Sequence, residues 1–288
     1  MRRYRGMRIL VFSPPWMSGG VKSLYSVCEW LDELGRARIM PFSEPRLASW
    51  FRHRCELYDY SYEPEVLIYP EVFQPNVPGK YHVCCALGKY APVQPHANLV
   101  VCRSREIEEW VLAQNPRLSA RRILPSINRG PFEYDGRRKN DTICYMTRRH
   151  KHPETAVQLR EAYGDRLVEI VDRTEDEVAE ILRSAKVFVW RGNESEGSPR
   201  PPKEALVAGC VVVGLQAEMT EALHINFGVR CATEAELVRM AGEALDMPMP
   251  SEKERSVVRD GREEKQDWLA LFKSLGIGRG LFTRPTGR

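Results

Sequence analysis

The sequence predicts an α/β protein of two domains, each built on a parallel sheet. Short apolar runs alternate with segments of helical periodicity in both halves of the chain, which is typical of parallel sheets covered on both faces. A stretch rich in proline, glycine and polar residues, 125–138, separates the two halves and is predicted to be a linker. The length of 288 residues suits two domains of about 100–150 residues each.

The first half begins with a predicted buried strand at 7–13, MRILVFS, bounded by two prolines. Apolar residues at helical spacing predict a helix over 21–34, which Gly35 ends. Ser104 is a candidate N-cap for a second helix, because acidic residues occupy the turn that follows it. Further strands are expected at 65–69, 81–87 and 99–102. The first domain is expected to span 1–128.

The second half repeats this alternation over the residues expected to form a domain at 139–288. Strands are expected at 142–146, 167–171, 186–190 and 211–214. Helices are expected at 154–163, at 175–184 and from 204. Apolar side chains within 251–275 are spaced for one face of an amphipathic helix, and the tail from 276 has little apolar content.

Composition places the chain among ordinary globular proteins, with 43% hydrophobic and 28% charged residues. No apolar run approaches the roughly 20 residues that a membrane-spanning helix needs. After the basic residues MRRYRGMR, the apolar stretch ILVF is too short for the core of a signal peptide. We therefore expect a cytoplasmic protein without a membrane span.

The eight cysteines are expected to be reduced, because seven of them lie in or beside apolar runs, as small buried hydrophobes do. Cys55 is the exception, in the polar segment FRHRCELYD. The chain has no C-x-x-C and no Cys/His pair at zinc-finger spacing, so no metal site is predicted. His53, His82 and His96 lie in the first half of the chain and could supply a catalytic base, although packed or surface histidines are the commoner reading.

Charge is nearly balanced, with 43 Lys+Arg against 39 Asp+Glu and a formal net charge of +4. Its distribution is more informative than its size. Arginines cluster within the first eight residues, and a second group of cations lies near the middle of the chain, at 137–139 and 148–151.

Gly19 and Gly20 lie between the first predicted strand and helix, at the carboxyl edge of a parallel sheet. Small residues there would let a ligand phosphate approach the backbone N–H groups of a helix N-terminus. The pair is neither G-x-G-x-x-G nor a P-loop. A tight turn without a ligand is an equally good reading.

Glu196 and Glu204 are separated by seven residues within 187–214, the most informative segment of the chain. One lies in a loop and the other near a helix start, at the edge where ligands bind in open α/β folds. A carboxylate can accept hydrogen bonds from two neighbouring hydroxyl groups, which suits sugar recognition. The alternative is a solvated Glu196 and a Glu204 that merely favours the helix N-terminus.

The segment EGSPRPPKEALVAGCVVVG resembles the E-x7-E signature of retaining GT-B glycosyltransferases of glycosyltransferase family 4, which usually reads like EGFGLPPxEAMACGCxVVG. Weaker similarities include ICYMTRRHKHPETA and SGGVKSLYSVCEWLDELG. The resemblance implies two Rossmann-like domains facing a cleft, with the C-terminal helix returning to the first. The first domain would hold the acceptor, and the second would bind a nucleotide-sugar.

The resemblance also implies roles for individual residues. Glu196 would be the catalytic residue that faces the donor sugar, and Glu204 would hold the ribose. Cations after the first strand of the second domain would neutralise the diphosphate leaving group. The implied donor-binding residues are Gly19, Gly20, Arg148, Arg149, Lys151, Gly197, Ser198, Arg200 and Glu204. No cofactor and no metal are implied, because enzymes of this type generally need no divalent ion.

The implied activity is transfer of a sugar, with retention, to a hydroxyl acceptor such as a glycan, a small molecule or a hydroxymethylated base in DNA. The DNA alternative rests on the basic clusters. A second alternative is a catalytically silent nucleotide-sugar-binding or scaffold protein, because Ser198, Pro199 and Arg200 replace the usual Phe-Gly-Leu. Pro199 has no N–H to donate. An epimerase on a similar scaffold is a third reading.

Overall fold

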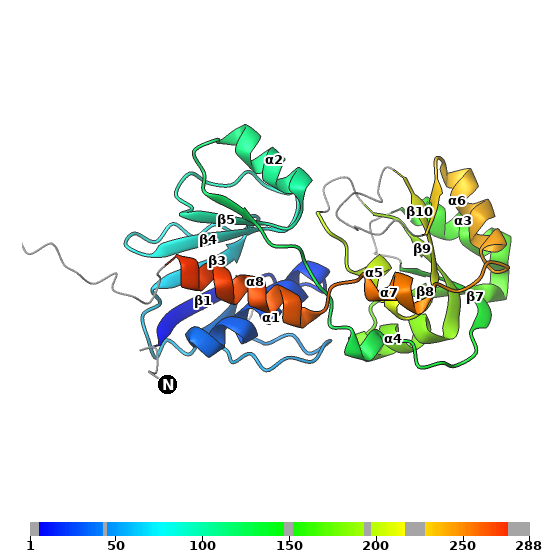
Figure 1. The fold of residues 1–288 in the computed structure, drawn as a ribbon, viewed down its shortest axis with the longest axis horizontal. Helices are drawn as coiled ribbons and strands as arrows, with labels where there is room; N and C mark the ends of the chain where they lie inside the picture. Colours follow the sequence, from blue (N-terminus) through cyan, green and yellow to red (C-terminus); the bar gives the residue numbers. More distant parts are fainter. Residues whose placement is uncertain (1–5, 43–44, 147–151, 193–196, 217–227, 276–288) are drawn as a thin grey trace, which may run out of the picture. The chain divides into compact units, whose positions relative to one another are not determined.

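The computed structural model describes residues 6–42, 45–146, 152–192, 197–216 and 228–275. The chain forms two compact units (Figure 1). Unit 1 comprises Met1–Leu124 together with Arg262–Arg288, and unit 2 comprises Pro125–Gly261. Each unit contains one sheet whose paired strands are all parallel. The predicted α/β class with two parallel-sheet domains is confirmed.

The sheet of unit 1 has six strands in the order β2-β1-β3-β4-β5-β6. They are β1 (Met7–Ser13), β2 (Gly35–Pro41), β3 (Val66–Pro70), β4 (Tyr81–Ala86), β5 (Leu99–Cys102) and β6 (Ala120–Arg122). The central strands β3 and β5 are buried along their whole length, because helices cover both faces of the sheet.

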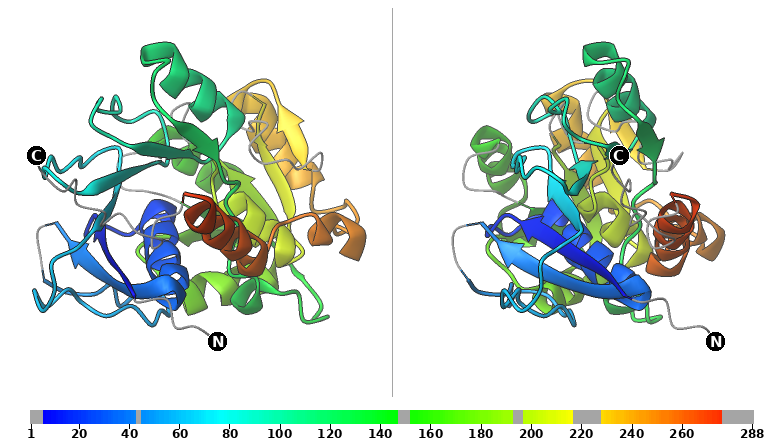
Figure 2. Two further views of the ribbon diagram at one scale, coloured as in Figure 1. Left: turned by 60° about the vertical axis from the view of Figure 1, so that its left-hand side comes forward. Right: turned by 90° about the vertical axis from the view of Figure 1, so that its left-hand side faces the viewer.

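Helices α1 (Gly19–Leu31) and α8 (Gly261–Ser274) contribute to the same core cluster on one face of this sheet, and α2 (Arg105–Gln114) contributes to the cluster on the other (Figures 1 and 2). Trp268 and Phe272 of α8 are fully buried in the cluster that α1 also lines. Ser104 caps α2 as predicted, with its hydroxyl accepting a hydrogen bond from the Ile107 amide at 3.2 Å. Although α8 is separated from β6 by all of unit 2 in the sequence, it completes the core of unit 1.

The sheet of unit 2 has five strands in the order β11-β10-β9-β7-β8. They are β7 (Asn140–Met146), β8 (Leu167–Ile170), β9 (Ala185–Trp190), β10 (Val211–Leu215) and β11 (Val229–Cys231). The helices are α3 (Pro153–Tyr163), α4 (Glu175–Ser184), α5 (Pro201–Val207), α6 (Glu234–Glu243) and α7 (Glu252–Ser256). Core residues of α4 and α5 pack on one face of the sheet, and those of α3 and α6 pack on the other.

The segment 125–138, predicted to be a linker, is packed into unit 2. Phe132 and Ile127 are fully buried in its core. Ile127 also donates its amide to the carbonyl oxygen of Arg259 at 3.2 Å. The turn-forming residues therefore mark an irregular but ordered connection rather than a solvated one. In the described part of the chain, no helix is long and apolar enough to cross a membrane.

Candidate functional site

Arg191 organises the carboxyl edge of the unit 2 sheet, directly after β9. Its guanidinium donates to Thr155 Oγ1 at 2.7 Å and forms an ion pair with Glu234. It also contacts His152 Nδ1 at 2.9 Å. The side chain of Arg191 is only 6% exposed. This one cation thus joins the end of β9 to the first turns of α3 and α6.

Both ring nitrogens of His152 are engaged by these contacts. Its Nε2 lies 2.9 Å from the carbonyl oxygen of Gly192. A carbonyl can only accept, so Nε2 carries the proton and Nδ1 accepts from Arg191. The backbone of His152 has a φ of 52°, in the left-handed region that non-glycine residues seldom adopt. The residue therefore sets the direction in which the chain enters α3.

Ligand-type atoms of His152, Glu154 and Glu234 lie within 4.8 Å of one another. The guanidinium of Arg191 contacts both His152 and Glu234. The chain's own cation thus stands where a metal ion would need to bind, and the arrangement favours anchoring over metal binding.

Glu204 is placed by the short helix α5 and is buried, with an exposure of 3%. Pro201 and Pro202 occupy the first turn of α5, where a missing N–H costs no helical hydrogen bond. Arg200 precedes them as the N-cap residue, and its Nε lies 3.6 Å from Glu204 Oε1. Both side chains are at most 8% exposed. A buried carboxylate is thus held beside a buried cation, one helical turn apart.

Ser198 and Lys203 form a second pair in this segment. Lys203 Nζ donates to Ser198 Oγ at 2.6 Å and to the carbonyl oxygen of Pro125 at 3.3 Å. Lys203 is 6% exposed, and Gly197 is buried beside Ser198. The loop before α5 is therefore anchored by a lysine that was not among the predicted site residues.

The predicted donor residues Gly197, Ser198, Arg200 and Glu204 are thus gathered around the start of α5. Glu196, Arg148, Arg149 and Lys151 lie outside the described residues, and their roles stay predictions. The last described residues before these predicted site residues are Met146, which ends β7, and Gly192, which lies two residues after β9. The strands β7 and β9 are neighbours in the sheet.

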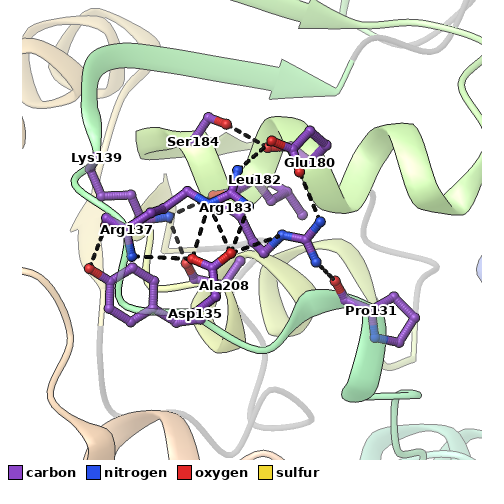
Figure 3. A network of polar contacts seen from close by, with 10 residues as sticks. Pro131, Asp135, Arg137, Lys139, Glu180, Leu182, Arg183, Ser184 and Ala208 are labelled. Carbon is purple, nitrogen blue, oxygen red and sulfur yellow. Dashed lines mark hydrogen bonds and ion pairs between the residues drawn. The ribbon is translucent and has the colours of Figure 1, made fainter.

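The cations at 137–139 lie before β7, at the opposite edge of the sheet (Figure 3). Arg137 Nη2 pairs with Asp135 Oδ2 at 2.6 Å, and this arginine lowers the pKa of Asp135 to about 2. Lys139 Nζ is buried and donates to the carbonyl oxygens of Leu182 and Ala208 at 2.7 and 2.6 Å. Burial lowers the pKa of Lys139. Lys139 therefore holds the ends of α4 and α5 together, whereas Arg137 forms ion pairs at the surface.

In unit 1, Gly19 and Gly20 form the first turn of α1, which begins two residues earlier than predicted. Ser18 caps it by accepting a hydrogen bond from the Val21 amide at 3.2 Å. A Cβ atom on Gly20 would lie 2.9 Å from Leu87 Cδ1, just beyond β4. The glycine pair therefore permits close packing against the neighbouring loop, and both glycines are half-buried.

Glu71 follows β3 at the same edge and is 1% exposed. Its two carboxylate oxygens accept hydrogen bonds from the amides of Leu87 and Gly88, both at 2.9 Å. Burial raises the pKa of Glu71 to about 7 even though these hydrogen bonds oppose the shift. Glu71 was not among the predicted site residues.

Comparison with known proteins identifies the fold. The sequence matches no protein-family model and no curated protein. Among solved structures, Anabaena Alr3699/HepE in complex with UDP and glucose has a TM-score of 0.63 at 10% identity, over 93% of this chain and 100% of that one. A glycosyltransferase from Rickettsia africae has a TM-score of 0.62 at 12% identity, and the match covers 94% of this chain and 98% of that one.

A UDP-GlcNAc 2-epimerase from Methanocaldococcus jannaschii, in complex with UDP-GlcNAc and UDP, is also similar. Its TM-score is 0.57 at 9% identity, and the match covers 93% of this chain and 100% of that one. At such identities the likeness concerns the fold, which glycosyltransferases and this epimerase share. The two parallel-sheet α/β domains of this chain have the fold of GT-B glycosyltransferases.

Proposed function

We propose that the chain is a retaining glycosyltransferase that moves a sugar from a nucleotide-sugar donor to a hydroxyl acceptor. The observation that carries the proposal is Glu204, a carboxylate buried at the start of α5 in a domain of GT-B fold. It follows Glu196 at the spacing of the family 4 signature. The named ligands of similar structures, UDP with glucose in one of them, are consistent with a nucleotide-sugar donor.

Glu204 is suited to hold the ribose of the nucleotide. An ionised carboxylate has two oxygens and about four lone-pair sites, so it can receive both hydroxyls of a vicinal diol. Each hydrogen bond to a charged group contributes roughly 1.5–3 kcal/mol. The Nε atom of Arg200 lies 3.6 Å from Glu204 Oε1, beyond ordinary hydrogen-bond length, so this contact is an ion pair.

In this proposal Glu196 faces the sugar, and Arg148, Arg149 and Lys151 neutralise the diphosphate as it leaves. These side chains would then stabilise the negative charge of the leaving group, as a divalent ion does in other transferases. Adding Mg²⁺ or Mn²⁺ to the reaction should leave its rate unchanged. A requirement for either ion would contradict this assignment.

A panel of nucleotide-sugars, assayed for released nucleoside diphosphate, tests the activity. Binding of the matching nucleotide is measured by calorimetry. Glu204→Ala should weaken binding by roughly a hundredfold or more, since two charge-assisted hydrogen bonds of about 1.5 kcal/mol or more each are lost. Glu196→Ala should retain binding and lose turnover. Glu252→Ala is the matched control, because Glu252 is an exposed first-turn acid of the short helix α7.

Unchanged binding and unchanged turnover in the two site variants would refute the site. The anomeric configuration of the product, read by NMR, tests retention. Inversion would refute that part of the proposal alone.

A catalytically silent nucleotide-sugar-binding protein is the second candidate. The observation that favours it is the departure at 198–200, where Arg200 is paired with Glu204 and Ser198 is bonded to Lys203. Binding of a nucleotide-sugar without hydrolysis or transfer to any acceptor tested would support it. Release of nucleoside diphosphate that depends on Glu196 would exclude it.

A further inference from the structure

Three side chains with metal-binding atoms converge in unit 1, away from the residues considered so far. Glu29 lies in the last turn of α1, and His53 and Cys55 lie in the connection between β2 and β3. One carboxylate oxygen, one ring nitrogen and the sulfur all lie within 4.8 Å of one another. In a tetrahedral Zn²⁺ site, bond lengths of about 2.0–2.3 Å separate neighbouring ligand atoms by about 3.3–3.8 Å. Small side-chain movements would bring the three atoms to that spacing.

His53 is oriented as zinc-binding histidines are. Its Nε2 lies 2.7 Å from the carbonyl oxygen of Ala48 and must carry the proton, because a carbonyl only accepts. The lone pair of the neutral ring is then on Nδ1, which is buried and has no hydrogen-bond partner among the residues that the structure describes. An imidazole that donates one N–H to a carbonyl and presents its other nitrogen to the metal is the usual arrangement in metal sites.

The other two side chains are also held in place. The amide of Arg54 donates to Glu29 Oε1, which orients that carboxylate. The thiol of Cys55 donates to the carbonyl oxygen of Tyr25 at 3.2 Å and is 8% exposed.

We propose that Glu29, His53 and Cys55 form a Zn²⁺ site in unit 1, in which a water molecule completes the tetrahedral coordination. The combination of sulfur, imidazole and carboxylate suits a borderline-soft ion and disfavours Mg²⁺ and Ca²⁺, which prefer oxygen. On binding, the S–H bond of Cys55 breaks, a Zn–S bond forms, and the proton passes to solvent. The site has no zinc-finger spacing, because its ligands are one glutamate of α1 and an H-x-C segment more than 20 residues later in the chain.

The position of the site indicates what the metal would do. Residues 45–65, which lead from β2 to β3, contain no helix or strand, and Leu57 forms an isolated bridge with Ile39 of β2. The metal would fasten this connection to α1. Glu29 lies ten residues, or about 15 Å along the helix, from Gly19, so the metal would be remote from the glycine turn.

Metal titration of the full-length chain, stripped with a chelator, tests the proposal. We expect one equivalent of Co²⁺ to bind with a sulfur-to-cobalt charge-transfer absorption, and Zn²⁺ to displace it. Cys55→Ala should abolish this absorption. Cys231→Ala, which removes a buried thiol from β11, is the matched control and should retain it.

Glu29→Gln and His53→Gln should each weaken Zn²⁺ binding more than about tenfold. These two side chains are only partly buried, so they carry the test if Cys55→Ala fails to fold. The absence of stoichiometric binding, the charge-transfer band persisting in Cys55→Ala, or wild-type affinity in both Gln variants would overturn the proposal. The readout is metal binding, and it is independent of glycosyl transfer.

Discussion

Removing the carboxylate of Glu264 should destabilise unit 1 strongly. Glu264 lies on α8 and forms an ion pair with Arg103, the residue that follows β5. The two side chains are 2% and 3% exposed. Trp268 Nε1 also lies 3.4 Å from the same carboxylate oxygen. Glu264→Ala would therefore leave a buried guanidinium without its counter-ion.

The expected cost follows from that burial. Breaking a buried ion pair by removing one partner costs about 3–5 kcal/mol, whereas replacing both partners with apolar residues is often neutral or stabilising. We expect Glu264→Ala to lower the free energy of unfolding by about 3–5 kcal/mol. The double variant Arg103→Met/Glu264→Leu should recover most of that loss.

Denaturant unfolding followed by tryptophan fluorescence measures this effect. Five of the six tryptophans lie in unit 1, and Trp190 lies in unit 2. The signal therefore reports mainly on the unit that contains the ion pair. Far-UV circular dichroism, recorded in parallel, shows whether the two units unfold together. Glu263→Ala, a change at the neighbouring exposed position of α8, is the control.

A loss below about 1 kcal/mol for Glu264→Ala would place the pair among weak surface bridges and refute the reasoning. The single variants Arg103→Met and Glu264→Leu complete a double-mutant cycle with the double variant. Strictly additive losses of unfolding free energy in that cycle would refute the reasoning as well, because coupled partners must show an interaction energy.

Three further predictions concern other buried charges. Lys139→Met should cost about 1–3 kcal/mol for each of the two carbonyls that lose their donor, seen as a lower unfolding midpoint of unit 2. Glu71 has a folded-state pKa of about 7, above its unfolded value of 4.5. The folded state therefore binds the proton more tightly, and the free energy of unfolding should fall by about 3 kcal/mol as pH rises from about 4.5 to 7. Melting temperatures measured across this pH range should show the fall in the wild-type chain and not in Glu71→Gln. Arg200→Leu should lower the melting temperature, because Glu204 loses a buried counter-ion, and an unchanged value would show that the pair contributes nothing.

The three strands that were not predicted from the sequence all lie at an edge of their sheet. β2, β6 and β11 were not predicted, and each is an edge strand. Edge strands can face solvent and carry charges, which interrupts the apolar run that marks a central strand. In β2, Arg36 and Arg38 alternate with Ala37 and Ile39, whose side chains enter the core. The central strands were predicted because both of their faces are buried.

The candidate site was predictable where its residues are close in the sequence. The signature segment indicated a glutamate at the start of a helix, and Glu204 is found there. The Arg191 network could not be predicted, because its partners Thr155 and Glu234 are 36 and 43 residues away. Only the parallel sheet, which brings strand ends to one edge, makes these residues neighbours.

The return of α8 to unit 1 determines the order in which the chain can acquire its structure during synthesis. Unit 2 is continuous from 125 to 261, so it is complete as soon as those residues have emerged from the ribosome. Unit 1 starts first but lacks Trp268 and Phe272 until later, and its core cluster stays open on that face. We therefore expect this chain to reverse the usual order, in which the N-terminal domain folds first. An incomplete chain that stops before 262 would carry a finished second domain and an unfinished first one.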